Sequence, residues 1–224
     1  MEDGKKMINI IYEDNHLLVV EKPINIPTQL DISNDKDLLT TLKEYIKEKY
    51  NKPGSVYLGL VHRLDRPVGG VMVFAKTSKA AKRLTEQIQN HVLKKEYYAV
   101  VCGKAKKSDH LVDKLLKDEK NNITRVSDKG KEAILDYELL DYKDNMSLVS
   151  INLETGRSHQ IRVQFSSRGL PLYGDQKYNK SAKVKEQLAL FSKKLTFNHP
   201  ITGEKLSFEL DLPNRYPFSL YKDQ

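Results

Sequence analysis

The stretch VHRLDRPVGGVMVFAKT, residues 61–77, joins a short charged turn to an apolar strand. Its only acid, Asp65, lies between Arg63 and Arg66, and a glycine pair, Gly69 and Gly70, leads into the run VMVFA. A carboxylate in such a turn is held in a fixed pose beside positive charge, which favours its ionised form. That arrangement suits a nucleophile or a base that acts on an anionic substrate. The alternative is an Asp that caps the turn or pairs with Arg63.

The hydrophobic pattern around this stretch predicts an α+β fold with a mixed, mostly antiparallel sheet and flanking helices and loops. Strands are expected at 8–12, 17–21, 57–62, 71–76, 95–103, 131–140 and 146–153, with further regular elements at 187–197 and 205–210. Helices are expected at 37–49, 78–91 and 158–167. Residues 104–130 look like a polar excursion with a short hairpin, and 169–180 like a loop.

In the second of these helices, Ser78 is the expected N-cap, and Ala81, Leu84 and Ile88 the inner face. The chain shows no repeat and no evident linker. We therefore expect one catalytic domain over 8–213, with 1–7 and 214–224 as short terminal extensions.

Charge is unevenly distributed along the 224 residues, which carry a formal net charge of +8. Basic side chains dominate residues 62–83, 91–131 and 157–194, whereas residues 1–50 and 132–156 are acidic. Gathered on one face, the basic blocks would form a footprint for a polyanion such as RNA. The alternative is a set of separate solvated faces.

The single cysteine, Cys102, excludes an intramolecular disulfide framework and a cysteine-rich zinc site. It lies in the apolar run YAVVC and fits a small core residue. The polar start MEDGKKMINI lacks the apolar core of a signal peptide, and no run reaches the length of a membrane span. We expect a cytoplasmic protein with no membrane partner, and a monomer.

The segment ETGRSHQIRVQF, residues 154–165, places several polar side chains on a predicted helix whose core residues are Ile161 and Phe165. Arg162 flanks this buried face, where an arginine is costly unless it is paired. Asp65 is an attractive partner, and the alternative is an arginine that snorkels at the helix edge.

Two further segments carry aromatic side chains among lysines. In KKEYYAVVCG, residues 94–103, Tyr97 and Tyr98 point to opposite faces of a strand. One of them should face the core or a cleft, where a tyrosine can stack on a flat ring or act as a weak acid or base. GLPLYGDQKY, residues 169–178, suits either nucleic-acid contact or an ordinary packed loop.

Taken together and in this order, the segments resemble the RluA-type pseudouridine synthase family over roughly residues 8–213. HRLDRPVGGVMVFAKT is similar to its catalytic loop and following strand, KKEYYAVVCG to its tyrosine-bearing strand, and ETGRSHQIRVQFSSRGLPLYGDQKY to its most characteristic block. LVVEKPINIP and FNHPITGEKLSFELDLP are similar to its first and last strands. The resemblance implies conversion of specific uridines to pseudouridine in structured tRNA or rRNA, without metal or cofactor.

The resemblance also implies roles for individual residues. Asp65 matches the catalytic Asp, Tyr97 the active-site Tyr, and Arg162 the Arg that pairs with that Asp. Arg63 matches an Arg that helps to displace the target base from the RNA stack. The remaining residues expected at the RNA lie in the same motifs: His62, Arg66, Arg157, His159, Gln160 and Lys177.

Three positions depart from the family pattern. Val68-Gly69-Gly70 stands where Thr-Ser-Gly or a close variant is usual, so the turn loses a hydroxyl and gains backbone freedom. Leu190-Phe191-Ser192 replaces the common Leu-His-Ala. Asn25 stands where Gly is usual, and Asn tolerates the left-handed conformation that such a site can require. Relatives often carry an N-terminal S4-type RNA-binding domain, whereas we expect a catalytic domain without one.

Two other functions compete with this interpretation. One is an RNA-binding protein that has kept the fold without the activity, which the presence of Asp65, Tyr97 and Arg162 argues against. The other is a hydrolase with paired carboxylates. Only Glu154 and Asp175 stand in the matched segments as second acids, and Asp175 is expected to order its glycine-rich loop instead.

Overall fold

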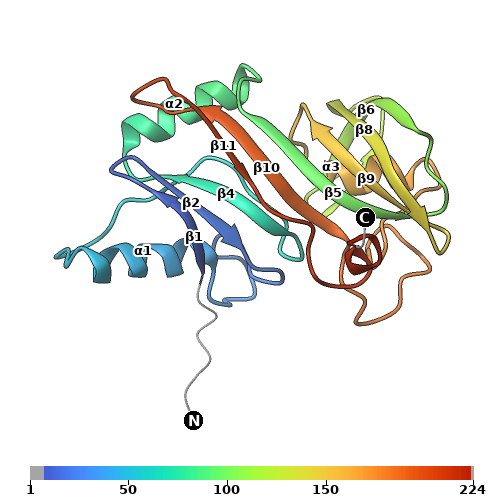
Figure 1. The fold of residues 1–224 in the computed structure, drawn as a ribbon, viewed down its shortest axis with the longest axis horizontal. Helices are drawn as coiled ribbons and strands as arrows, with labels where there is room; N and C mark the ends of the chain where they lie inside the picture. Colours follow the sequence, from blue (N-terminus) through green and yellow to red (C-terminus); the bar gives the residue numbers. More distant parts are fainter. Residues whose placement is uncertain (1–7, 223–224) are drawn as a thin grey trace, which may run out of the picture. The chain divides into compact units, whose positions relative to one another are not determined.

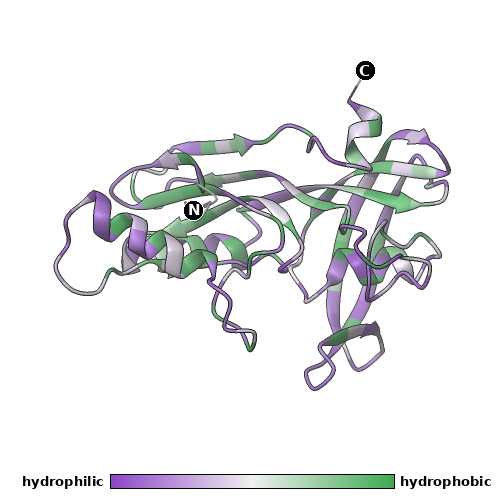
Figure 2. Cartoon of the chain, turned by 90° about the horizontal axis from the view of Figure 1, so that it is seen from below, coloured by the Kyte–Doolittle hydropathy of each residue, from purple (hydrophilic) through white to green (hydrophobic). Residues whose placement is uncertain are grey.

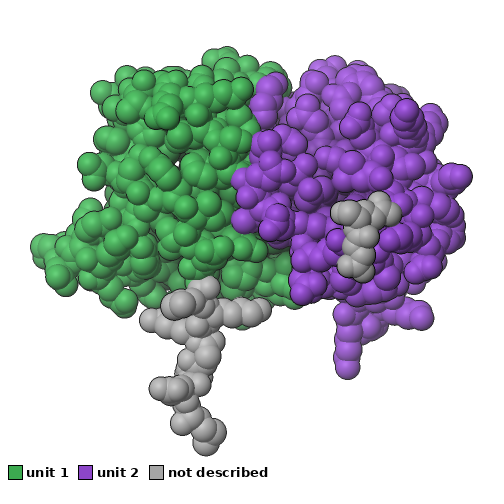
Figure 3. Space-filling model, in the orientation of Figure 1, with its two compact units in different colours: residues 1–93, 195–208 green, residues 94–194, 209–224 purple. Residues whose placement is uncertain are grey.

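The computed structural model describes residues 8–222. The chain divides into two compact units, and Figure 3 shows them in separate colours. Unit 1 comprises residues 1–93 and 195–208, and unit 2 comprises residues 94–194 and 209–224. The predicted extension at 1–7 lies outside the described residues. Among those residues, no helix is both long and apolar enough to cross a membrane.

Unit 1 is built on antiparallel strands with two helices (Figure 1). Its strands are β1 (Asn9–Glu13), β2 (Leu17–Lys22), β3 (Gly59–Leu60) and β4 (Gly69–Ala75). β2 pairs with β1 and with β4, and β3 pairs with β4. All seven residues of β4 are buried, as expected for the run GGVMVFA. This buried strand is the support on which the preceding Asp65 turn rests.

The two helices of unit 1 begin at side-chain caps. In α1 (Leu38–Lys49) the carboxylate of Asp37 accepts from the N–H of Thr40. In α2 (Ser78–Gln89) the hydroxyl of Thr77 accepts from the N–H of Ala80, so the prediction that Ser78 is the N-cap was wrong by one residue. Thr77 takes the extended conformation that an N-cap needs, whereas Ser78 is already helical.

The inner face of α2 shifts accordingly. Ala80 and Leu84 are buried, whereas Ala81 and Ile88 are half-buried. Figure 2 shows hydrophilic and hydrophobic residues mixed along the helices, and strands that range from largely hydrophobic to largely hydrophilic.

Unit 2 contains a second set of antiparallel strands and one short helix. The strands are β5 (Lys94–Cys102), β6 (Ser108–Asp118), β7 (Ile123–Val126), β8 (Lys131–Lys143) and β9 (Met146–Leu153). β9 pairs with β5 and β8, and β6 pairs with β8 and β7. The hairpin expected within 104–130 is therefore real, but β6 is eleven residues long. Leu111 and Leu115 anchor β6 in the core.

The helix of unit 2, α3 (Gln160–Ser166), begins two residues later than predicted. His159 adopts a left-handed conformation, φ 53°, and therefore cannot belong to the helix. Ile161 and Phe165 are buried as predicted. Similarly, the strand expected at 57–62 is reduced to the two residues of β3.

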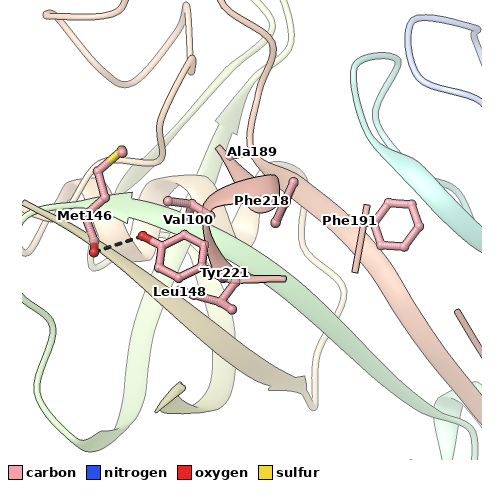
Figure 4. Packing of buried hydrophobic residues seen from close by; sticks show 7 residues of the cluster. All are labelled: Val100, Met146, Leu148, Ala189, Phe191, Phe218 and Tyr221. Carbon is pink, nitrogen blue, oxygen red and sulfur yellow. Dashed lines mark hydrogen bonds between the residues drawn. The ribbon is translucent and has the colours of Figure 1, made fainter. Parts of the chain in front are cut away.

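The last elements are β10 (Leu190–Asn198), β11 (Lys205–Glu209) and the 3-10 helix η1 (Phe218–Tyr221). The side chains of Phe218 and Tyr221 enter a buried cluster of unit 2 that also contains Val100 and Leu148 (Figure 4). The hydroxyl of Tyr221 donates to the carbonyl of Met146 at 3.0 Å. The predicted α+β class with a mostly antiparallel sheet is thus confirmed.

Candidate active site

The turn that carries Asp65 is held from beneath by the buried side chain of Lys22. Lys22 ends β2 and is 1% exposed. Its Nζ donates to four carbonyl oxygens: those of Val68 at 2.6 Å, Pro23 at 3.1 Å, Arg66 at 3.1 Å and Asp65 at 3.4 Å. The N–H of Val68 also donates to the carbonyl of Asp65 at 2.9 Å and closes the turn. The main chain at Asp65 is therefore fixed by donors on its inner side.

Burial lowers the pKa of Lys22 to about 7, and the negative charge of Asp65 acts in the opposite direction. The influence of Asp65 on this pKa places its carboxylate within electrostatic range of the Lys22 ammonium. Asp65 itself is half-buried, between the buried side chains of Leu64 and Val68. The turn thus holds Asp65 half-buried, with its main chain anchored to the core by Lys22.

The glycine and asparagine departures both have local explanations. A Cβ on Gly69 would lie 3.0 Å from Cγ2 of Ile24 and from the carbonyl oxygen of Lys22. The close passage of residues 22–24 thus accounts for the missing side chain at this position. Asn25 adopts φ 65°, as predicted for a residue in place of Gly, and its N–H donates to the carbonyl of Arg66 at 2.9 Å.

The two arginines beside Asp65 have different surroundings. Arg66 is tied to the preceding loop: it donates to the Ser33 hydroxyl at 3.0 Å and forms ion pairs with Asp31 and Asp35. Arg63 is exposed, and within residues 8–222 its guanidinium makes no hydrogen bond or ion pair. Arg63 is therefore the more available of the two for contact with RNA.

His62 is half-buried, and one nitrogen of its ring forms a hydrogen bond within the protein. Its Nε2 accepts a hydrogen bond from the N–H of Val73 in β4 at 3.1 Å. Nε2 must therefore be unprotonated in this arrangement. His62 links the segment before Asp65 to the strand after it.

Tyr97 lies on the inward face of β5. It is 6% exposed and pairs in register with Ile151 of β9, while Tyr98 on the opposite face is half-buried. The ammonium of Lys193 lies 4.7 Å from the centre of the Tyr98 ring. The prediction that one tyrosine of this pair turns inward is confirmed, and the inward one is Tyr97.

Arg162 has a buried partner that the sequence did not identify. Its Nε donates to Oδ2 of Asp175 at 2.8 Å, and Nη2 donates to Oδ1 at 2.7 Å. The residues are 4% and 0% exposed. Burial alone would raise the pKa of Asp175, but Arg162 and the N–H groups of Lys177 and Tyr178 together outweigh this effect, and the pKa is lowered. Arg162 is thus a rigidly held, buried cation rather than a snorkelling one.

Asp175 also orders its own loop, as predicted. Its Oδ1 accepts from the N–H groups of Lys177 and Tyr178 at 3.0 and 3.2 Å. The ring of Tyr178 in turn covers the Arg162 guanidinium, whose carbon lies 5.1 Å from the ring centre. One carboxylate therefore fixes both the arginine and the aromatic side chain that packs on it.

The Tyr178 hydroxyl extends this network. It accepts from the N–H of Thr124 in β7 at 2.8 Å and lies 2.6 Å from Nδ1 of His159. Which of the two donates in this second bond depends on the tautomer of His159. His159 is 9% exposed. It therefore joins the start of α3 to the β6–β7 hairpin.

The other predicted RNA contacts differ in exposure. Gln160 is buried, and four hydrogen bonds use its amide: Oε1 accepts from Thr155 and Arg157, and Nε2 donates to Ile134 and Gln164. Arg157 and Lys177 are exposed, and their side chains donate to the carbonyls of Glu132 and Asn122. The side-chain amide of Gln160 is thus fully hydrogen-bonded within the protein, whereas the side chains of Arg157 and Lys177 lie at the surface.

The predicted site residues fall into two groups. His62, Arg63, Asp65 and Arg66 lie together in unit 1, and the remaining six lie in unit 2. The motifs did not reveal the support that Lys22 gives to the turn or the pairing of Asp175 with Arg162. A search of the sequence for oppositely charged partners would not reveal the role of Lys22, because its acceptors are main-chain oxygens.

Comparison with known proteins adds an independent result. A family model described as RNA pseudouridylate synthase matches residues 16–167. The ribosomal large subunit pseudouridine synthase D of Zymomonas mobilis is 35% identical over 220 residues, which cover 92% of this chain and 69% of that protein. YhcT, an uncharacterized RNA pseudouridine synthase of Bacillus subtilis, is 35% identical over 211 residues with the same two coverages.

A solved structure shares the fold. The human RNA pseudouridylate synthase domain containing 4 superposes with a TM-score of 0.79 at 22% identity. The match covers 95% of this chain and 91% of the human chain. At this identity the likeness concerns the fold alone, and it agrees with the family match.

Proposed function

The chain belongs to the RNA pseudouridylate synthase family, and on this premise we propose that Asp65 is the residue that acts on the ribose of the target uridine. The chain is an RNA pseudouridine synthase, an isomerase. One observation carries the assignment of Asp65: its turn is clamped by the buried Lys22, while Asp65 is half-buried and lies two positions after the exposed Arg63. A fixed and ionised carboxylate next to a free cation is what attack at the sugar of an anionic substrate requires.

The reaction begins with exposure of the base. A uracil within folded RNA must leave its stack, which costs a few kcal/mol. In the proposal, Arg63 enters the space that the base vacates and holds neighbouring phosphates. A free guanidinium can do so without first losing a protein partner.

The chemical step exchanges one glycosidic bond for another. In one route, the Asp65 carboxylate bonds to C1′ as the C1′–N1 bond breaks, and the electron pair remains on the detached uracil. The uracil turns, its C5 bonds to C1′, the carboxylate leaves, and the C5 proton is removed. In the other route, Asp65 removes the C2′ proton as the C1′–N1 bond breaks, so a glycal and detached uracil form. C5 of the turned uracil then bonds to C1′ as the proton returns to C2′, and the C5 proton is removed. Both routes need the ionised carboxylate.

Tyr97 and Arg162 complete the proposed site. Tyr97 is assigned to the detached base, either as a stacking surface or as the group that helps remove the C5 proton. Asp175 occupies Nε and Nη2 of Arg162. In the proposal, the other terminal nitrogen of Arg162 forms an ion pair with Asp65 and keeps it charged.

Purified protein tests the assignment of Asp65. Total RNA from cells that lack the gene is incubated with the wild type, Asp65→Asn or Asp128→Asn, an exposed control in unit 2. Asp65→Asn should fold and bind RNA but form no pseudouridine, because an amide is neither a nucleophile nor a base here. Asp128→Asn should match the wild type. Normal product formation by Asp65→Asn would exclude the assignment.

We propose two candidates for the target RNA. Relatives are named for the ribosomal large subunit, which makes rRNA the first candidate. A tRNA or a small stem-loop common to both is the second, and we expect a monomer to act on either. Sequencing for pseudouridine in the same incubations identifies the modified position and separates the two.

An RNA-binding protein without activity is the competing function. The clamped Asp65 turn and the buried Arg162–Asp175 pair argue against it, because an inactive binder would not need them. Retained RNA affinity without any pseudouridine formation by the wild type would support it.

A further inference from the structure

Lys95 is a buried lysine on the same face of β5 as Tyr97. Residues 95, 97, 99 and 101 are all buried, and they alternate with less buried positions up to residue 98, so they form the inward face of the strand. Lys95 is 7% exposed and pairs in register with Leu153 of β9. Side chains two residues apart on a strand are separated by about 7 Å. Lys95 is therefore the next inward side chain after the candidate active-site tyrosine.

This buried ammonium has no partner among residues 8–222. Within the described part of the chain, its Nζ makes no hydrogen bond and no ion pair. Burial lowers the pKa of Lys95, with no carboxylate to oppose the effect. Lys22, the other deeply buried lysine, donates to four carbonyls instead. A charge buried without a partner is costly, and such groups in folded proteins usually have a reason.

The Nζ of Lys95 is nevertheless within reach of a ligand. Its Nζ is not among the fully buried side-chain nitrogens and oxygens that lack a hydrogen bond in residues 8–222, so this atom keeps some exposed surface. A Cβ on Gly156 would lie 3.2 Å from this Nζ, so the absence of a side chain there leaves the space beside the ammonium open. Gly156 immediately precedes Arg157, an exposed arginine of the same unit.

We propose that Lys95 binds a backbone phosphate of the RNA next to the target uridine. A bound anion would pair with the Lys95 ammonium, and the lack of a side chain at Gly156 leaves room for that anion. Lys95 and Tyr97 lie two residues apart on the same face of β5. A nucleotide whose base contacts Tyr97 could therefore place a phosphate beside Lys95. The identity of the RNA as substrate rests on the proposed function, whereas the affinity of Lys95 for phosphate does not.

Lys95→Met tests the proposal, with Lys94→Met as the matched control. Lys94 is the preceding residue and is exposed. Lys95→Met should raise KM for RNA about tenfold or more, the fold-change expected for a lost charge-assisted hydrogen bond. It should leave kcat within about threefold and reduce the salt slope of RNA binding by about one. Lys95→Arg should retain most of the affinity, and Lys94→Met should behave as the wild type.

Thermal unfolding separates a binding role from a structural one. Removal of an unpartnered buried charge should leave Tm unchanged or raise it, so Lys95→Met should be at least as stable as the wild type while binding RNA less well. A lower Tm for Lys95→Met, or equal losses of affinity in Lys94→Met and Lys95→Met, would overturn the proposal.

Inorganic phosphate gives a test that does not depend on the RNA reaction. Phosphate should raise the Tm of the wild type above that in chloride of equal ionic strength, and this rise should shrink in Lys95→Met and in Gly156→Ala. An equal rise in all three proteins would contradict a phosphate site at Lys95. If the wild type modified no RNA, the proposed function would fail while this arm still reported on Lys95.

Discussion

Lys22 and Asp65 lie 43 positions apart, and Lys22 reaches the main chain of the turn rather than a side chain. This contact explains how a turn that is followed directly by two glycines keeps a defined shape. The turn contributes its carbonyls as acceptors, and the end of β2 contributes the donors. The position of the candidate catalytic carboxylate therefore depends on a residue far from it in sequence.

Lys22→Met should remove these donors while keeping the length of the side chain. The carbonyls of Asp65, Arg66 and Val68 would lose buried partners, and a lost buried hydrogen-bond partner costs about 1–3 kcal/mol. We expect the free energy of unfolding, measured in urea, to fall by about 2–4 kcal/mol. Pseudouridine formation well below Tm should fall at least tenfold.

Lys47→Met, at an exposed position of α1, is the control and should change neither quantity by much. Wild-type activity in folded Lys22→Met would show that the clamp is not needed to place Asp65.

At the scale of single residues, the sequence predicted the catalytic side chains but not the residues that support them. Asp65 and Tyr97 could be proposed because their motifs are local. Arg66 looked like an RNA contact, yet its guanidinium pairs with Asp31 and Asp35, in a loop about 30 residues earlier. The sequence pattern cannot reveal such ion pairs, because they depend on how a loop packs against a distant part of the chain.

At the scale of elements, α3 and the loop after it act as one rigid piece. Arg162 on α3, together with Asp175 and Tyr178 in the loop, forms a buried ion pair capped by an aromatic ring. The sequence predicted both elements and the ordering role of Asp175. It did not predict the ion pair between Arg162 and Asp175. Both Asp65 and Asp175 are possible partners in the sequence, and only the fold shows that Asp175 lies within hydrogen-bonding distance of Arg162.

Asp175→Asn should destabilise the protein by about 3 kcal/mol or more, since it leaves Arg162 buried without its counter-charge. Because the folded pKa of Asp175 is lowered, its stabilisation is present above the unfolded pKa of about 4 and is lost as the pH falls through the folded value. The stability difference between wild type and variant should therefore narrow below about pH 4.

Denaturation in urea between pH 3 and 7 measures this difference. Asp109→Asn, which removes an exposed pair with Lys106, should cost less than about 1 kcal/mol at any pH. A constant difference between wild type and Asp175→Asn across this range would contradict the role of the charge.

The 3-10 helix η1 provides a second test at this scale. Phe218 is fully buried in the unit 2 cluster, so Phe218→Ala should lower the free energy of unfolding by about 3–5 kcal/mol. Val184→Ala, at an 84% exposed position, should have little effect. Equal stability of the two variants would show that the C-terminal segment is dispensable, as a terminal extension would be.

At the scale of the whole molecule, the chain passes from unit 1 to unit 2, back to unit 1 and again to unit 2, so neither unit is a continuous segment. Hydrophobic periodicity predicted most strands and all three α-helices within a few residues, because the buried positions recur regularly. The division into units was not predicted, since it depends on contacts between distant segments. The domain over 8–213 and the pairing of Asp65 with Arg162 stay predictions.

The central claim is that this protein forms pseudouridine through Asp65. Pseudouridine mapping of total RNA tests it most directly, in cells that lack the gene and carry either the wild-type protein or Asp65→Asn at equal levels. The account predicts at least one position that is lost on deletion, restored by the wild type and not restored by Asp65→Asn. Restoration by Asp65→Asn, or an unchanged map after deletion, would contradict it.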